Sequence, residues 1–228
     1  MTDMTLFSGP LSMFGAKAHI AALEKNLPIN VVMVPFTMDH HYDPKHPEVL
    51  RVNPKRQVPV LIHGDVEIFD STQIFEYFEH LQPQPPLWPS QPAARARARL
   101  LELKSDEVFF PHVIRLMGLQ DCLGEAAAQE AISQLAQYYE AIDAMLEGSD
   151  YIAGEYTYAD IAFYMAQTFA ARLGAPMNHA TPRLLAWRER LTARPAVHQV
   201  VLQFADSLKR YKLRVPDFIP RAVAAKSG

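Results

Sequence analysis

The sequence predicts a small α/β domain followed by a larger all-α bundle. Short apolar runs typical of strands alternate with helical segments up to about residue 82, and strand-like runs stop after residue 92. Between them, the segment "LQPQPPLWPSQP" contains five prolines, so it should be stiff, extended and unable to form helix or sheet. We therefore divide the chain into an N-terminal domain at 1–82, a linker at 83–92 and a C-terminal domain at 93–228.

Composition limits the possible partners and compartments. The 228 residues are 49% hydrophobic and 21% charged, a balance that supports a folded core. The formal net charge of −3 does not favour nucleic acid or an anionic membrane as a partner. The start "MTDMTLFSG" lacks the pattern of a signal peptide, and no apolar run approaches the roughly 20 residues that span a bilayer. The single cysteine, Cys122, cannot form an internal disulfide, so we expect a cytoplasmic protein in which Cys122 is a small buried hydrophobe.

Residues 1–82 have the pattern βαβ followed by ββα. The run "INVVMVPF" is continuously apolar, which predicts a strand buried on both faces. Within the later hairpin, Pro59 removes a ladder donor and therefore belongs at an edge, a strand start or a bulge. The expected strands are "MTLFS", "INVVMVPF", Val58–Ile62 and Val66–Phe69; the expected helices are "MFGAKAHIAALEKN", a short one around Pro47 to Val52, and "STQIFEYFEHL".

Residues after the linker are expected to be helical throughout. The first long helix is interrupted by Pro111, where a kink is expected. Thr157 and Asp160 have the spacing of a capping box, and Thr181 followed by proline is typical of a helix start. We expect "AVHQVVLQFADSLKR" to close the bundle and "VPDFIPRAVAAKSG" to form a poorly ordered tail.

Three separated motifs in this two-part layout resemble the cytosolic glutathione transferase family. They are "QVPVL", then "DS" twelve residues after Val58, then "YTYADIAFY" in the third bundle helix. The resemblance covers roughly residues 4 to 210. It implies a thioredoxin-like N-terminal domain, an all-α C-terminal domain, glutathione as co-substrate and a homodimer. Within the family, it points to a serine-type member of the bacterial, zeta or theta kind.

The resemblance assigns glutathione contacts to the "RQVP" segment. Pro59 is expected to be cis, and Val58 to hold the cysteinyl part of glutathione through its backbone. This is physically reasonable because glutathione is a peptide, which can pair with an exposed backbone as an added strand does. Gln57 matches a side chain that contacts the glycyl end. Arg56 either assists as a cation or is a solvated surface residue.

The same resemblance assigns the γ-glutamyl end of glutathione to Asp70 and Ser71. A helix N-terminus offers unpaired N–H groups and a positive potential to a carboxylate, and the Asp can face the ammonium group. The spacing from Asp70 to Gln73 also permits a reciprocal helix cap. Capping and ligand binding are compatible, because both use the same helix end.

The catalytic group is expected in "LFSGPLSMFGAK". This segment has Phe7 but no Tyr or Cys, which disfavours two of the family's mechanisms. The segment starting at Ser12 resembles the family's "SPFG" form with Met13 in place of proline. Ser12 is therefore the catalytic candidate and Ser8 the alternative, while a plain helix cap is a third reading of Ser12.

The function implied is conjugation of the glutathione thiolate to electrophilic small molecules. Glutathione-dependent isomerisation is an alternative, although the "SSC" triplet of that branch is missing. A non-catalytic glutathione-binding or regulatory module is another. The electrophile pocket is expected around residues 105–115, where Phe109, Phe110 and His112 lie, although aromatic residues at such spacing are more often core.

Other polar residues are assigned no chemistry. The adjacent His40 and His41 lack further ligands at suitable spacing, so we expect no metal site. The arginines at the start of the first bundle helix, Arg95, Arg97 and Arg99, are more typical of a solvated helix start or a dimer contact than of a nucleic-acid site. Thr157 and Asp160 are expected to be structural.

Overall fold

The computed structural model describes residues 3–43 and 45–219 and divides into two compact units. Unit 1 contains the chain up to Pro86 together with Gln199–Leu213, and unit 2 contains Leu87–His198 and the chain from Arg214. The division after Pro86 falls inside the proline-rich segment. The sequence-based division differs at the other end, because it places the last helix wholly in the bundle.

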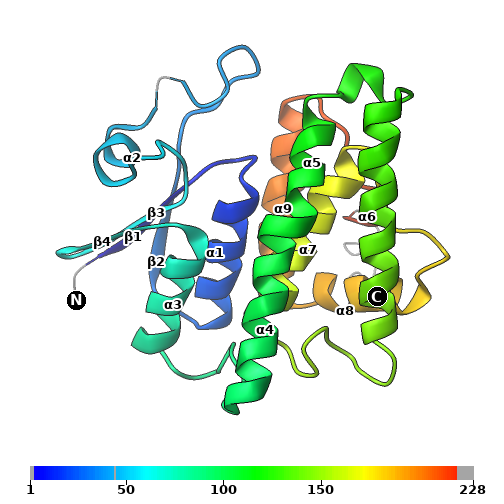
Figure 1. The fold of residues 1–228 in the computed structure, drawn as a ribbon. Helices are drawn as coiled ribbons and strands as arrows, with labels where there is room; N and C mark the ends of the chain where they lie inside the picture. Colours follow the sequence, from blue (N-terminus) through cyan, green and yellow to red (C-terminus); the bar gives the residue numbers. More distant parts are fainter. Residues whose placement is uncertain (1–2, 44, 220–228) are drawn as a thin grey trace, which may run out of the picture. The chain divides into compact units, whose positions relative to one another are not determined.

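Unit 1 is built on a four-stranded mixed sheet with the strand order β2-β1-β3-β4. β1 (Met4–Ser8) pairs in parallel with β2 (Ile29–Met33) and antiparallel with β3 (Val60–His63). β3 pairs antiparallel with β4 (Val66–Phe69). The sheet and its helices have the expected thioredoxin-like layout (Figure 1).

The prediction that "INVVMVPF" is buried on both faces is wrong. β2 covers only Ile29–Met33 and lies at an edge of the sheet, where Met33 is 45% exposed. Apolar composition alone cannot distinguish a central parallel strand from an edge strand whose side chains line a cavity. The latter is the case here, since Val31 and Met33 line an open cavity.

Helices cover both faces of this sheet. α1 (Met13–Glu24) and α3 (Ser71–Leu81) pack against each other on one face, and α2 (Pro47–Val52) lies on the other (Figure 1). Alternation along the strands divides their side chains between the two faces. The α2 face holds a cluster formed by the buried side chains of Phe7, Val34, Val49 and Val60.

A buried lysine joins the ends of α1 and α3. Lys25, which follows α1, is 1% exposed, and its ammonium contacts Glu79 Oε2 at 2.6 Å. The same ammonium donates to the carbonyl oxygens of Gln82 at 2.8 Å and Pro85 at 2.9 Å. The charge therefore has an anionic partner and two further acceptors, which a buried ammonium requires.

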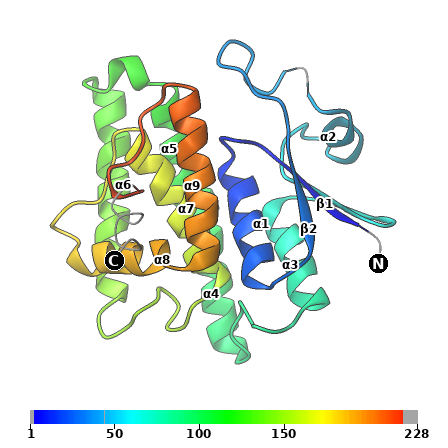
Figure 2. The ribbon, with the colours of Figure 1, turned by 180° about the vertical axis from the view of Figure 1, so that it is seen from behind.

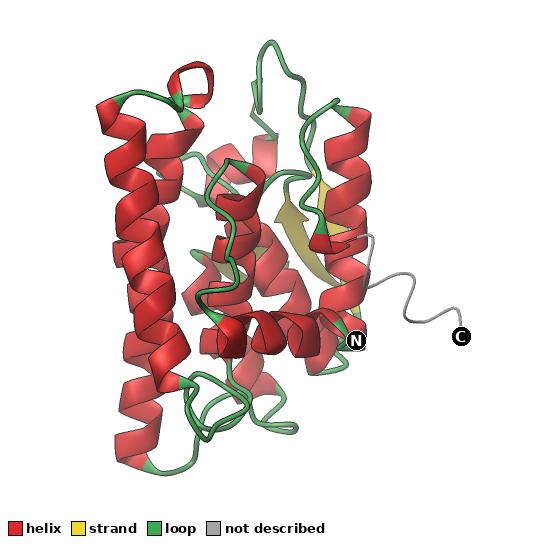
Figure 3. Cartoon of the chain, turned by 90° about the vertical axis from the view of Figure 1, so that its right-hand side faces the viewer, coloured by secondary structure: helices red, strands yellow, loops and turns green. Residues whose placement is uncertain are grey.

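The described part of unit 2 is helical (Figure 3). α7 is buried along nearly its whole length and forms the centre of this unit. The elements are α4 (Pro92–Lys104), η1 (Ser105–Phe109), α5 (Phe110–Met117), η2 (Gln120–Cys122), α6 (Ala126–Met145), α7 (Tyr158–Arg172) and α8 (Pro182–Thr192). Thr181 precedes α8, whose first residue is proline, as predicted.

The irregularity expected at Pro111 takes the form of a π-helical turn just before it. The N–H of Phe110 bonds to the carbonyl of Ser105, five residues earlier. Pro111 has no N–H and cannot donate an ordinary helical bond, which explains an irregularity near this position. Helix α5 then continues from Phe110.

The last helix, α9 (Pro195–Arg210), belongs mainly to unit 1. Figures 1 and 2 both place it alongside α1, and its Val200 and Phe204 line a cavity together with Ala16 of α1. The sequence-based expectation that this helix closes the bundle therefore holds only for its first turn.

The predicted tail from Val215 is partly ordered. Ile219 is 1% exposed, and its N–H bonds to the carbonyl of Pro216. The ring of Phe218 makes an edge contact with Tyr164 of α7. The rest of the predicted tail, residues 220–228, lies outside the described residues.

Candidate functional site

The register of the sheet brings three predicted site segments to one end. Phe7 of β1 pairs with Val60 of β3, and Val60 pairs with Phe69 of β4. The C-terminal ends of β1 and β4 and the N-terminal end of β3 therefore lie at the same end of the sheet. The segments that carry Ser12, Val58 and Asp70 all adjoin this end.

Ser12 is the N-cap of α1. Its backbone is extended, with φ −105° and ψ 114°, and its Oγ accepts from the N–H of Gly15 at 3.0 Å. The N–H of Ser12 itself donates to the carbonyl of Gly9. Because Oγ serves as the acceptor for Gly15, the hydroxyl proton is available for another group in front of the helix N-terminus.

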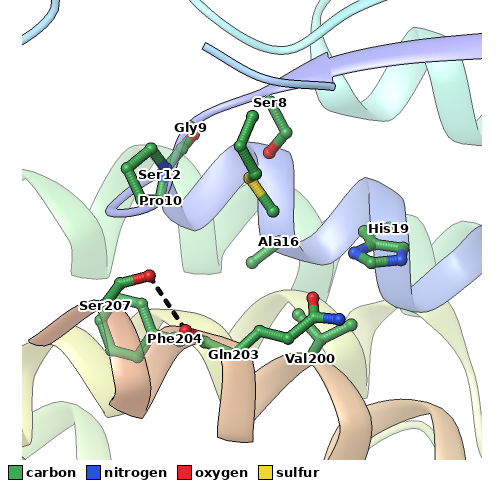
Figure 4. Close-up of a pocket in the computed structure, with 11 residues that line it drawn as sticks. Ser8, Gly9, Pro10, Ser12, Ala16, His19, Val200, Gln203, Phe204 and Ser207 are labelled. Atoms are coloured by element: carbon green, nitrogen blue, oxygen red, sulfur yellow. Dashed lines mark hydrogen bonds between the residues drawn. The ribbon is translucent and has the colours of Figure 1, made fainter. Parts of the chain in front are cut away.

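Ser8 and Ser12 converge on Gly15, and both line a small cavity of about 20 Å³ (Figure 4). A Cβ at Gly15 would overlap with the Oγ of Ser8 and lie 3.2 Å from that of Ser12. Ser8 is 1% exposed, whereas Ser12 is half-buried. A glycine is therefore needed at this position, and Ser12 is the more accessible of the two hydroxyls.

The Val58–Pro59 peptide bond is cis, as the resemblance implied. Pro59 immediately precedes β3, one of the positions that a sheet allows for proline. Val58 is half-buried against the apolar cluster beneath the sheet. Gln57 and Arg56 are exposed, and Arg56 has a φ of 57°.

Asn53 holds this loop in place, a role that the sequence reading missed. Its side chain is buried, donates to the carbonyl of Gln57 at 2.6 Å and accepts from the N–H of Lys55 at 2.9 Å. The N–H of Arg56 donates to the carbonyl of Asn53. The dipeptide Asn-Pro is a known turn signal and is the feature that could have identified it.

Asp70 caps α3 from a strained backbone position. Its φ is 76°, which a residue with a Cβ rarely adopts, and Oδ1 accepts from the N–H groups of Thr72 at 3.0 Å and Gln73 at 3.2 Å. The next residue, Ser71, is 3% exposed. Such strain is often found at functional sites, and here it places a carboxylate at a helix N-terminus.

Tyr42 supports the loop that carries Ser12 and was also missed. Its hydroxyl oxygen accepts from the N–H of Leu11 at 3.1 Å, and a Cβ at Gly9 would lie 2.5 Å from it. Burial raises the pKa of Tyr42 to about 12, so the group stays protonated near neutral pH. No periodicity marks a tyrosine in a loop, so the sequence offered no signal for this contact.

The predicted structural pair lies in unit 2 and forms the expected capping box. Asp160 is fully buried; Oδ2 accepts from the N–H and hydroxyl of Thr157, and Oδ1 accepts from Ile152 N–H and Trp187 Nε1. Burial raises the pKa of Asp160 to about 6, against the opposing effect of these hydrogen bonds.

The aromatic residues expected at an electrophile pocket are partly core. Phe109 is fully buried, with ring centroids of Tyr138 and Phe163 at 5.1 and 5.2 Å. Phe110 is 5% exposed and contacts Phe169. His112 is half-buried. These contacts explain the two phenylalanines as packing within unit 2.

Residues 3–43 and 45–219 contain no group of three or more His, Cys, Asp or Glu side chains that could hold a metal ion. Over the same residues, no helix is long and apolar enough to cross a membrane. His40 and His41 are both exposed.

Comparisons with known proteins address the family. Residues 6–86 match the glutathione S-transferase N-terminal domain, and residues 107–195 match the glutathione S-transferase C-terminal domain. Glutathione S-transferase 3 of Zea mays is 30% identical over 88% of this chain and 94% of its own length. The crystal structure of a Tau-class glutathione S-transferase of mango, Mangifera indica, superposes with a TM-score of 0.76 at 28% identity, covering 92% of this chain and 98% of the other.

A second kind of relative has a different name. A stringent starvation protein A homolog of Coxiella burnetii is 34% identical over 109 residues, which are 47% of this chain and 48% of the relative. The chain thus spans about half the length of that relative. The full-length similarity to the maize protein and the two domain matches decide the assignment: the chain belongs to the glutathione S-transferase family.

Proposed function

We propose that this chain is a glutathione transferase enzyme that conjugates the glutathione thiolate to electrophilic small molecules. The observation that supports it best is the meeting of three segments at one end of the sheet: the Ser12 helix start, the loop before β3 and the start of α3. Each offers polar groups of the type that a short anionic peptide needs.

Each segment has a separate role in this proposal. Val58 binds the cysteinyl backbone, and Gln57, with Arg56 as an added cation, binds the glycyl end. Ser71 and the N-terminus of α3 bind the γ-glutamyl carboxylate. Asp70 uses Oδ1 to cap α3, which leaves Oδ2 to face the ammonium group.

Ser12 lowers the pKa of the bound thiol in this mechanism. A free thiol of this type has a pKa near ~8.5, and lowering it by about two units requires roughly 2.7 kcal/mol. One hydroxyl donor to a charged sulfur supplies about 1.5–3 kcal/mol. The N-terminus of α1 adds roughly 0.3–1 kcal/mol. These contributions together are sufficient without a metal or a further base.

A non-catalytic, regulatory glutathione-binding module is the second candidate. Two observations favour it: the match to a protein named for stringent starvation, and Met13, which departs from the proline of the family's "SPFG" form. An isomerase of the same fold is a weaker alternative. We further infer a cytoplasmic homodimer, from the lone cysteine and the family resemblance.

Binding and turnover can be separated by two measurements on the purified chain. We expect retention on glutathione-agarose and conjugation of a generic aryl halide. Ser12→Ala should lower kcat/KM by about 10–100-fold and raise the pKa of its pH profile, because the thiolate loses a hydrogen-bond donor. The KM for glutathione should change little.

Ser8→Ala is the matched control, since Ser8 lines the same cavity but is buried. A larger loss of kcat in Ser8→Ala than in Ser12→Ala would reassign the hydroxyl. Retention without turnover would favour the regulatory candidate, and no retention would contradict glutathione binding itself.

A further inference from the structure

A cavity of about 400 Å³ in unit 2 lies between α8, the loop before it and the segment that follows α9. This volume is within the range of small-molecule sites. Its apolar surface comes from Met177 and Pro216, which are both buried, and from Leu185 and Phe218. The residues proposed to hold glutathione are not among those that line it.

Hydrogen bonds and a ring contact fix two walls of this cavity. In the loop before α8, Asn178 Oδ1 accepts from the N–H of Ala180 at 2.8 Å, and the carbonyl of Asn178 accepts from the N–H of Thr181 at 3.1 Å. In the segment after α9, the ring centroid of Phe218 lies 4.3 Å from the guanidinium carbon of Arg188 on α8. A cavity whose walls are already ordered lowers the entropic cost of binding a ligand.

Charged side chains of both signs line the cavity without pairing with one another. Glu189 on α8 and Arg214 and Asp217 in the segment after α9 are exposed, and their side chains form no ion pair with the residues that the structure describes. Arg188 adds a second positive charge beside Phe218. A ligand of one charge would complement one sign and lie close to the other, so this lining favours a ligand that carries both.

We propose that this cavity binds a short zwitterionic peptide with free termini and apolar side chains. The terminal carboxylate pairs with Arg214 and Arg188, and the terminal ammonium pairs with Glu189 and Asp217. The apolar side chains contact Met177 and the other apolar residues of the wall. An extended dipeptide spans about 7 Å, which separates its two charges so that each can reach its own partners.

This site requires neither turnover nor the glutathione contacts in unit 1, so it can fail without affecting the proposed transferase activity. Glutathione is itself a zwitterionic peptide, but it has a second carboxylate and no large apolar side chain. The extra negative charge would lie near two carboxylates in this cavity, so glutathione should compete poorly for it.

Calorimetric titration of the chain with leucyl-leucine tests the site, without and with saturating glutathione. We expect saturable binding with a Kd below about 1 mM that changes by less than about twofold when glutathione is added. N-acetyl-leucyl-leucine lacks the ammonium, leucyl-leucine amide lacks the carboxylate and glycylglycine lacks the apolar side chains, so each should bind about fivefold or more weakly. Equal affinity for the four peptides, displacement by glutathione, or no binding at millimolar concentration would overturn the proposal.

Charge variants then assign the two ends of the peptide. Arg214→Gln should weaken binding of leucyl-leucine about fivefold or more but leave that of the amide within about twofold, because the amide has no carboxylate to lose a partner. The double variant Glu189→Gln with Asp217→Asn should likewise weaken leucyl-leucine but leave the acetylated peptide within about twofold.

Arg97→Gln and Glu155→Gln are the matched controls, since both residues are exposed in unit 2 and do not line the cavity. They should leave all affinities unchanged. The altered side chains are all exposed, so each variant should fold, which thermal unfolding checks. Equal effects of Arg214→Gln and Arg97→Gln, or equal losses for leucyl-leucine and its amide in Arg214→Gln, would contradict the assignment.

Discussion

Two serines face one glycine at the start of α1, and their surroundings separate their roles. Ser8 lies at the end of β1, where its carbonyl accepts from the N–H of Val34 and its side chain is buried. Ser12 lies at a helix N-terminus, where its hydroxyl is partly accessible. In the mechanism that we propose, the sulfur of glutathione approaches Ser12 and the positive N-terminus of α1.

Asn53 should matter for glutathione binding although it lies outside the predicted contacts. Asn53→Ala removes two hydrogen bonds that fix the loop before Val58, and it leaves the carbonyl of Gln57 without this donor. We expect a loss of about 1–3 kcal/mol in the free energy of unfolding and a KM for glutathione raised about tenfold. Urea unfolding and steady-state kinetics measure the two effects.

Asn30→Ala is the control for this change, because Asn30 is exposed on β2. It should change neither quantity measurably. An Asn53→Ala protein with the glutathione KM of the wild type would show that the loop keeps its conformation without the side chain.

His19 should make stability depend on pH in the acidic range. Burial lowers its folded pKa to about 4, below the ordinary 6.5, so between these values the unfolded chain binds more protons than the native one. The free energy of unfolding should therefore fall by about 2–3 kcal/mol as the pH drops from 7 to 4.5. Asp206 and Arg210, which line an open cavity together with His19, are the charged groups nearby.

The variant His19→Gln isolates this contribution in urea unfolding at both pH values. The buried Asp160 has the opposite effect, because its raised pKa of about 6 makes stability fall as the pH rises from about 4 to 6. Asp160 is unchanged in the variant, so it cancels from the difference. If wild type and His19→Gln lose stability in parallel, His19 titrates normally in the folded protein.

At the scale of elements, Lys25 and Glu79 couple the ends of α1 and α3. Lys25→Met keeps the length of the side chain but leaves the Glu79 carboxylate, which is 10% exposed, without its cation. We expect a loss of about 3–5 kcal/mol in the free energy of unfolding. The double variant Lys25→Met with Glu79→Gln should regain part of it, because the uncompensated charge is gone.

Chemical denaturation of the two single variants and the double variant measures this coupling. Arg51→Met is a suitable control, since the ion pairs that Arg51 makes with Glu48 and Glu67 lie at the surface, where such pairs contribute about 0–1 kcal/mol. Equal losses in Lys25→Met and Arg51→Met would mean that burial does not strengthen the Lys25 interaction.

Elements with local signals could be predicted from the sequence. The short helix Pro47–Val52, the capping box of α7 and the start of α8 each depend on residues within one turn of one another, and the structure confirms them. The burial of β2 was predicted wrongly, because its apolar run gives no indication of which neighbour covers it. Tyr42 was missed because its contact with Leu11 depends on how two distant loops fold, whereas Asn53 has a local Asn-Pro turn signal that the sequence reading did not use.

At the scale of the whole molecule, the three separated motifs and their order along the chain predicted the family and the folds of the N-terminal and C-terminal domains. The sequence could not predict that most of α9 belongs to unit 1. An amphipathic pattern shows that a helix buries one face, but it does not identify the partner. Val200 and Phe204 would serve equally well in a bundle, and only the three-dimensional structure places them beside Ala16.

Truncation tests this grouping. A chain ending at His198 loses the α9 segment that belongs to unit 1, whereas a chain ending at Ile219 keeps all of it. We expect amide hydrogen exchange within α1 to become at least about tenfold faster in the shorter chain only, because one side of that helix loses its cover. Equal protection of α1 in both chains would show that α9 contributes nothing to unit 1.

Because Gln199–Leu213 completes unit 1, this unit is discontinuous in the chain. During synthesis, the sheet of unit 1 emerges from the ribosome long before the α9 segment that completes this unit. The whole of Leu87–His198 is made in between. Domains usually fold as they emerge, from the N-terminus onward. Here the N-terminal unit starts first and is completed only after Gln199–Leu213 has been made, so the nascent chain exposes the apolar flank of α1 until then.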